Sequence, residues 1–331
     1  MNNVLIFSDL HITQSSLKEC ILILEEIGNL ANTYNIDTLI DLGDTFDSLK
    51  PTSTELDIFA TFIRRLNKKI IILAAQSHES TTQEESILNH YGILSDNVIV
   101  VKEFKDSNHL YCGHFSTKES SKNYDAKISK EDLKDYLYVF LGHIHSHELI
   151  KPNILHLGSC RYINFDEAKD KQKIVALITD YNTETEKIHF IKLKSPIPMI
   201  QLELGKNNEK NDFLDPQNEA INQKSLKFAP INTPNPSQIE ALCQRLDKLD
   251  PQIKVKVKIL DFESFREFLP LVNKYSSKFE IFKYETEFII IPEKDNKAKT
   301  EITTFKESFL NWLKNQKIDP KITEILQKEI V

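Results

Sequence analysis

The sequence predicts an α/β protein with one large domain followed by a smaller one. Over about the first 195 residues, short apolar strands alternate with amphipathic helical stretches, which is typical of a layered domain built around β-sheet. Residues 205–237 then break this pattern, because they are rich in Asn, Pro, Gln and Lys and have little periodicity. A length of 331 residues allows each part a core of its own.

Strands and helices alternate regularly in the large domain. A strand at 4–7 leads into a helix at 16–32, whose apolar residues recur at three- and four-residue spacing. Further strands are expected at 38–42, 69–73, 98–101, 109–113, 136–142 and 154–158, and further helices near 53–67, 82–90 and 129–135. Residues 173–193 contain two strand patterns around a polar turn, which predicts a hairpin.

The second part of the chain predicts a compact α/β unit and a helical tail. Helices are expected at 237–248 and 262–275, and strands at 253–260 and 279–291. Residues 303–331 have the pattern of two amphipathic helices. The expected domains are 1–196, 197–300 with the linker included, and 301–331.

The formal net charge of −7 argues against a protein that binds nucleic acid through bulk electrostatics alone. Residues 201–331 contain 21 basic and 21 acidic residues, so the acidic excess lies within residues 1–200. Such an excess suits a domain that binds cations. A solvated acidic surface explains most of these charges equally well.

The composition is that of a soluble protein, with 40% apolar and 27% charged residues. The four cysteines are far apart and form no CxxC pair, so we expect buried thiols in a reducing compartment. No apolar run reaches membrane-spanning length, and the N-terminal residues lack the features of a signal peptide. These features predict a cytoplasmic protein that does not contact membranes.

Aspartate and histidine follow the predicted strands in five short motifs. The motifs are SDLH (Asp9, His11), DLGDTFD (Asp44), QSHE (His78), CGHFS (His114) and LGHIHSH (His143, His145). Open α/β sheets place their sites at the carboxyl ends of strands, and residues two apart in extended chain can reach one cation together. A single Asp or His at such a place is usually a turn or surface residue. Five in this order predict a metal site.

The order D-x-H, G-D, N-H-[D/E], G-H, G-H-x-H resembles that of calcineurin-like metallophosphoesterases, over residues 1–160. The small unit and helical tail make the chain resemble, more narrowly, the SbcD-type recombination and repair nucleases, including small versions encoded by tailed phages. The resemblance implies an α-β-β-α sheet sandwich with a small α/β capping domain and a C-terminal helical pair. It also implies metal-dependent DNA exonuclease or endonuclease activity, in the host cytoplasm if the protein is viral.

Two divalent metals are implied by the resemblance. Their ligands would be Asp9, His11 and His145 for one metal, His114 and His143 for the other, and Asp44 as the bridge between them. Imidazole and carboxylate ligands suit Mn²⁺ best here, with Fe or Zn²⁺ as alternatives. A carboxylate bridge keeps two metals about 3.5–4 Å apart, the spacing that serves phosphoryl displacement.

The third motif departs from the family pattern. The family has Gly-Asn-His-[Asp/Glu], whereas this chain has Gln76, Ser77, His78 and Glu79. His78 would stabilise charge on the phosphate or protonate the leaving oxygen, and Glu79 would orient His78 or the local loop. Ser77 offers a weaker oxygen ligand than Asn, so the second metal would lose a ligand or take a water. Asp47 is expected either to cap the following segment or to orient a ligand from outside the site.

Three lysines of the small unit alternate along the strand expected at 253–260. Lys254, Lys256 and Lys258 would share one face and, with His147, could contact DNA phosphates. A solvated edge strand protected by lysines is at least as good an interpretation. For His147, a surface role is the alternative.

The tail presents an apolar face that needs a partner. That face contains Phe305, Phe309, Trp312, Leu313, Ile322 and Ile325. Two short amphipathic helices cannot bury their apolar faces against each other alone. The resemblance implies that they bind an SbcC-type ABC ATPase, in a complex that contains a homodimer of this chain and acts on DNA ends.

Two other functions fit part of the sequence. The first is a metallophosphoesterase acting on nucleotides or RNA, which would not need the small unit or the helical tail. The second is a weakly active scaffold subunit, in which Ser77 leaves the second metal site poorly occupied.

Overall fold

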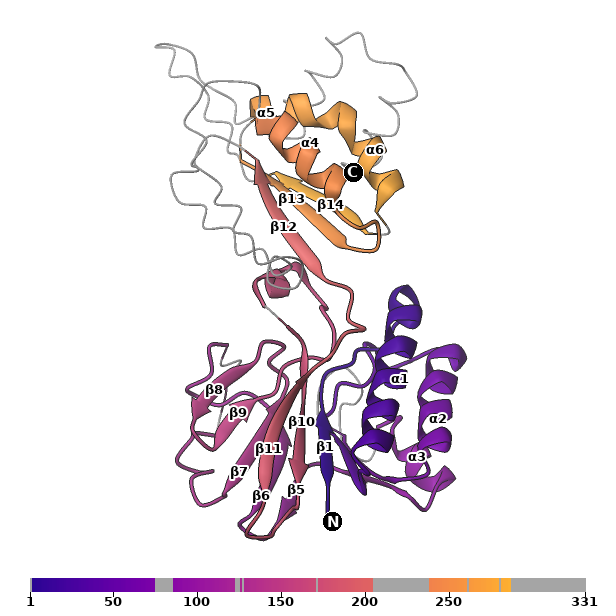
Figure 1. Cartoon of the computed structure of the whole chain (residues 1–331), viewed down its shortest axis with the longest axis vertical. Coiled ribbons are helices and arrows are strands. Elements are labelled where there is room, and N and C mark those ends of the chain that lie inside the picture. The colour runs from indigo at the N-terminus through magenta and orange to yellow at the C-terminus, as the bar shows by residue number, and fades with distance from the viewer. Residues whose placement is uncertain are drawn as a thin grey trace, which may run out of the picture.

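The computed structural model of the chain shows a mixed α/β protein (Figure 1). It describes residues 2–74, 86–122, 126, 128–170, 172–204, 238–260, 262–279 and 281–286. The predicted linker at 205–237 and the predicted tail at 303–331 lie outside the described residues, as do residues 75–85 with the third motif.

The first sheet is mixed and has six strands. Its strands are β1 (Val4–Phe7), β2 (Thr38–Asp41), β3 (Lys69–Leu73), β4 (Val98–Val101), β10 (Ile174–Thr179) and β11 (Lys187–Lys192). Their order is β11-β10-β1-β2-β3-β4. Strands β1, β2, β3 and β4 run parallel, and β10 pairs antiparallel with both β1 and β11. The hairpin predicted at 173–193 is therefore confirmed.

Side chains alternate along the strands, so the central part of this sheet contributes to a core on each face, whereas the edge strand β11 is largely exposed. Leu5 and Phe7 of β1 belong to a core with α1 (Leu17–Thr33) and α2 (Ser53–Leu66). Val4 and Ile6 belong to the core on the opposite face. A short 3₁₀ helix, η1 (Gln14–Ser16), precedes α1. Both long helices lie where the apolar spacing predicts them.

The second sheet packs its inner face on the first. Its strands are β5 (Phe104–Asp106), β6 (Leu110–His114), β7 (Tyr138–Gly142), β8 (Glu148–Lys151) and β9 (Ile154–His156), in the order β5-β6-β7-β9-β8. Cys112 and Phe140 share one core with Ile6 and Ile40 of the first sheet. Strands β6, β7 and β9 are parallel.

The outer face of the second sheet differs from the prediction. Leu133 and Tyr136 cover it, but the helix expected at 129–135 is a run of turns. The described residues therefore show no second helical layer of the predicted α-β-β-α order. Few apolar side chains anchor this segment, and a helix that short is marginal alone. Residues 82–85 of the helix expected near 82–90 lie outside the described residues, and the described part of this region contains α3 (Asn89–Leu94).

The small unit has its own sheet and its own core. Strands β12 (Met199–Leu204), β13 (Lys254–Ile259) and β14 (Phe282–Thr286) are parallel, in that order. The helices are α4 (Gln238–Lys248), α5 (Phe262–Phe268) and α6 (Val272–Lys278), with a 3₁₀ turn, η3 (Leu269–Leu271), between the last two. Since β13 is the central strand, the interpretation of 253–260 as an edge strand is wrong.

Figure 1 shows the small unit beyond one end of the two-sheet domain, reached through the connection from β11 to β12. Cys20, Cys112 and Cys160 are buried free thiols, and Cys243 is half-buried. Among the helices that the structure describes, none has both the length and the apolar character to cross a membrane.

Candidate metal centre

Four of the five sequence motifs lie in described residues, and each follows or ends a parallel strand. Asp9 follows β1, Asp44 follows β2, His114 ends β6 and His143 follows β7. The carboxyl ends of both sheets therefore carry the predicted side chains. The third motif follows β3, and its residues Ser77, His78 and Glu79 lie outside the described part of the chain.

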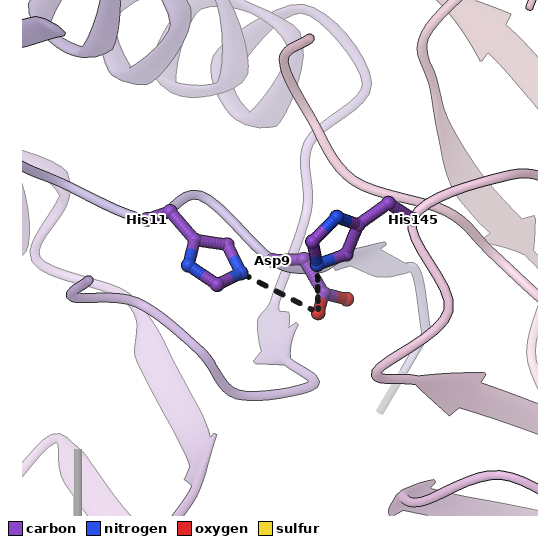
Figure 2. A group of neighbouring side chains, drawn as sticks. All are labelled: Asp9, His11 and His145. Carbon is purple, nitrogen blue, oxygen red and sulfur yellow. Dashed lines mark ion pairs between the residues drawn. The ribbon is translucent and has the colours of Figure 1, made fainter. Parts of the chain in front are cut away.

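Two groups of metal-ligand side chains form at these strand ends. The first cluster consists of Asp9, His11 and His145, and the second cluster of Asp44, His114 and His143. In each cluster, one ligand atom per residue lies within 4.8 Å of the others. Figure 2 shows the imidazoles of His11 and His145 flanking the carboxylate of Asp9. The residues and their grouping agree with the sequence prediction.

Asp44 lies between the two clusters. Its Oδ2 is 3.3 Å from Nε2 of His114 in its own cluster and 3.5 Å from Nε2 of His11 in the first. A second link is the carboxylate of Asp9, which accepts a hydrogen bond of 3.1 Å from the backbone N of His143. The clusters therefore adjoin, and Asp44 is the residue placed to serve both.

The backbone of the candidate ligands is strained. Left-handed φ angles occur at Asp9 (50°), His11 (47°), Asp44 (51°) and His143 (77°). Each such residue costs about 1–3 kcal/mol and persists only where its surroundings enforce it. Here the loops after β1 and β2 hydrogen-bond to each other, from N of Asp9 to O of Gly43 at 3.0 Å and from N of His11 to O of Asp44 at 2.9 Å. Strain of this kind gathers at functional sites.

Two glycines make room for His114. A Cβ at Gly43 would lie 2.8 Å from Nδ1 of His114, and Gly43 also has a φ of +105°. A Cβ at Gly142 would lie 2.7 Å from the same atom and 2.6 Å from Oγ of Ser8. Both distances are too short for real contacts, so the glycines of the G-D and G-H motifs serve the packing of this imidazole.

The ring orientation of His114 is fixed by the backbone. Its Nδ1 is 2.8 Å from the carbonyl oxygen of Leu42, which can only accept, so Nδ1 carries the hydrogen. Nε2 then points into the second cluster, 3.3 Å from Oδ2 of Asp44. That atom is buried, and it makes no hydrogen bond that meets the geometric criteria with another described residue. Nε2 is therefore the ring nitrogen of His114 that can bind a metal.

Carboxylates orient the two imidazoles of the first cluster. Nδ1 of His11 lies 3.0 Å from Oδ1 of Asp47, and Nδ1 of His145 lies 3.1 Å from Oε1 of Glu167. Metal-binding histidines characteristically donate their other ring N–H to such partners. Lys173 contacts Glu167 in turn, at 2.5 Å. With Lys173 and His145 beside it, Glu167 has a pKa near 2, although burial alone would raise it.

The charges of the site call for a cation. Asp9 and Asp44 are 0% and 1% exposed, and buried carboxylates need a positive partner. Burial alone would lower the pKa of His114, but Asp44 and Asp9 outweigh it and raise that pKa to about 10. His143, by contrast, has its pKa lowered to about 4 by burial and by nearby His114. The donor set, with its buried Nε2 atom, therefore fits divalent cations.

Of two further residues predicted to serve the site, Asp47 contacts a candidate ligand and His147 does not. Asp47 contacts His11 as expected. His147 is exposed, as the surface alternative predicts, with its Nδ1 3.4 Å from O of Leu157 and its ring centroid 5.4 Å from that of Phe190. No described contact places it at the clusters.

The prediction of a DNA contact is wrong for Lys254. Only 4% of this residue is exposed, and its Nζ lies 2.7 Å from Oε2 of Glu19 in α1. The first lysine of β13 is thus an internal ion-pair residue. Lys256 is half-buried and pairs with Glu285 at 2.6 Å, and Lys258 is half-buried as well.

Sequence reasoning did not find Glu167, Lys173 or Arg161. Glu167 lies in η2 (Phe165–Lys169), where it also completes a capping box with Asn164. The local pattern therefore signals a helix cap and not a residue of a metal site. Arg161 donates from Nη1 to O of His11 at 3.0 Å, a contact across 150 positions that no local pattern reveals.

No protein-family model matches this chain, and no curated protein matches it either. The geometry of the two clusters is therefore the main evidence on function.

Proposed function

We propose that the chain is a two-metal phosphoesterase. The observation that carries the proposal is the pair of adjoining clusters with Asp44 between them. Asp9, His11 and His145 would hold one metal, His114 and His143 the other, and Asp44 both. Imidazole and carboxylate donors suit Mn²⁺, with Fe or Zn²⁺ as alternatives.

The bound metals would supply Lewis-acid activation of water and neutralise charge on a phosphate. The chain itself would keep the site in order. Leu42, Asp47 and Glu167 hold the imidazoles in the tautomers that ligation needs. His78, with Glu79 beside it in sequence, would bring a proton to the leaving oxygen.

More narrowly, we propose a DNA phosphodiesterase of the SbcD type, the nuclease subunit of an end-processing complex in recombination and repair. The order of the five motifs, the two facing sheets and the separate small unit support this. The tail from Thr303 to Val331 would bind an SbcC-type ATPase, and the complex would contain two copies of this chain.

The test is hydrolysis of linear duplex DNA by the full-length protein with its ATPase partner. We expect cleavage that depends on Mn²⁺, stops with EDTA and is lost in His78→Ala, the variant that keeps both described clusters. A closed circular DNA, an RNA and a nucleotide serve as parallel substrates. Cleavage of the nucleotide or RNA alone would replace the DNA assignment, and no hydrolysis of any substrate would contradict the enzyme.

A weakly active scaffold is a second candidate, favoured by one observation. Ser77 stands where the resembled family has an Asn ligand. A scaffold would bind the ATPase through 303–331 yet hydrolyse DNA no faster than His78→Ala. Deleting 303–331 should abolish that binding under either function, and unchanged binding would refute the role given to the tail.

A further inference from the structure

A buried ion-pair network joins the small unit to the large domain. At its centre is Glu19 of α1, which is 2% exposed. Its Oε2 lies 2.7 Å from Nζ of Lys254, the first residue of β13, and 3.4 Å from Nε of Arg161. Its Oε1 accepts a hydrogen bond of 2.8 Å from N of Ile197, just before β12. One carboxylate therefore fastens both the connection into the small unit and its central strand.

The same network reaches a candidate metal ligand. Arg161 is 6% exposed and donates from Nη1 to the carbonyl oxygen of His11 at 3.0 Å. His11 has a left-handed backbone, with φ at 47°, which its surroundings must enforce. The chain of contacts runs from Lys254 through Glu19 and Arg161 to His11.

A second path leads to the other histidine of the first cluster. Strand β12 packs on η2, and Nζ of Lys256 lies 5.9 Å from the centroid of the Phe165 ring in η2. The same short helix carries Glu167, which holds Nδ1 of His145 at 3.1 Å. Both paths end in the first cluster. In the second cluster, His114 rests on the carbonyl of Leu42 and on glycines of the sheet ends.

We propose that Glu19 and Lys254 are positioning residues that couple the docking of the small unit to the geometry of the first cluster. With Lys254 in place, Lys254 and Arg161 both form ion pairs with the carboxylate of Glu19, and Arg161 keeps its hydrogen bond to the carbonyl oxygen of His11. Without Lys254, the side chain of Glu19 keeps its ion pair with Arg161 and its hydrogen bond from N of Ile197, and β13 loses its ion pair with α1. The first cluster then loosens, while the second keeps its backbone supports. This inference rests on the proposed metal centre.

The test is Mn²⁺ binding by calorimetry to the full-length chain in two backgrounds. His143→Ala leaves the first cluster complete, and His145→Ala leaves the second complete. Adding Lys254→Met, which keeps the length of the side chain without its charge, should weaken Mn²⁺ binding about tenfold in the His143→Ala background. Binding in the His145→Ala background should not change. Equal weakening in both backgrounds, or none in either, overturns the coupling.

Lys274→Met is the matched control, because it removes an ion pair inside the small unit. Nζ of Lys274 lies 2.9 Å from Oδ1 of Asp247, and both side chains are exposed, unlike the buried pair of Lys254 and Glu19. This variant should leave Mn²⁺ binding unchanged in both backgrounds. If Lys254→Met does not fold, Glu19→Gln replaces it, since the amide keeps the shape and an acceptor oxygen.

Coupling must also act in the reverse direction, because linkage is reciprocal. Mn²⁺ added to His143→Ala should slow hydrogen exchange in 253–260, whereas Mn²⁺ added to His145→Ala should not. Slowing in neither background, with Mn²⁺ bound, refutes the coupling and leaves the metal centre standing. A chain with all ligands intact that takes up no Mn²⁺ refutes the proposed function and this inference with it.

Discussion

The two clusters contain the same residue types, one Asp and two His each, yet different parts of the chain hold them. In the first cluster, the ligands are positioned by other side chains. Asp47 and Glu167 orient the imidazoles, and Arg161 donates a hydrogen bond to the backbone of His11. In the second, His114 is held by the carbonyl of Leu42 and by contact with glycines at the strand ends. The first cluster is therefore open to influence from distant elements, while the second depends on the sheets themselves.

The largest effect should come from the residue that the clusters share. Asp44→Asn keeps the shape of the side chain but removes its charge beside His11 and His114. We expect Mn²⁺ binding at both sites to weaken by at least about 100-fold and hydrolysis to be lost, since an inner ligand should matter at least as much as its outer partners. Calorimetry and DNA hydrolysis check this. If only one site weakens, Asp44 does not bridge the clusters.

A change at Glu167 should lower the metal affinity of the first cluster and leave that of the second unchanged. Glu167→Gln keeps a polar group near His145 but removes the charge that holds its Nδ1–H, and it leaves buried Lys173 with Asp170 as its acidic partner. Mn²⁺ affinity of the first cluster should fall by about 10–100-fold, with the second unaffected. Titration in the His143→Ala and His145→Ala backgrounds measures each. A loss of Mn²⁺ affinity confined to the second cluster would contradict the role given to Glu167.

The complementary change is at Gly142. A Cβ there collides with Nδ1 of His114 and Oγ of Ser8, so Gly142→Ala should lower the free energy of unfolding by about 1–3 kcal/mol and weaken the second cluster. Gly28→Ala is the matched control, because a Cβ there meets only Leu66, at 3.6 Å, and alanine favours the helix. That control should stabilise the chain by roughly 0.5–1 kcal/mol in thermal or urea unfolding. Equal destabilisation by both would exclude a specific role for Gly142.

The smallest effect is expected at Ser77. Ser77→Asn supplies the amide oxygen that the resembled family places on its second metal. It should tighten Mn²⁺ binding by the second cluster, leave the first unchanged and raise the rate of DNA hydrolysis. A variant with unaltered affinity and rate would show that this position is not a ligand.

The residues that the sequence could predict are those whose role depends on interactions between neighbours along the chain. Asp9, Asp44, His114 and His143 could be found because each belongs to a strand end, where apolar pattern and motif coincide. The helix expected at 129–135 failed because this charged segment has too few apolar contacts to anchor a helix. Lys254 was misjudged because alternation along a strand does not reveal which face a neighbouring domain covers.

Apart from Asp47, the supports of the first cluster lay beyond local patterns. Glu167 has a sequence signal, but that signal is a capping box with Asn164 and says nothing of His145. Arg161 and Glu19 meet across 142 positions, and only the packing of the small unit on the large domain brings them together with Lys254. Such contacts depend on tertiary structure and become visible only there.

The central claim is that two cations share this site. The most direct measurement is anomalous scattering at the manganese edge from crystals of the full-length chain grown with Mn²⁺. If two cations share the site, the map should contain two peaks, one among Asp9, His11 and His145 and one among His114 and His143, with Asp44 in contact with both. A map with no peak at these residues, or with metal held by other side chains, would contradict it.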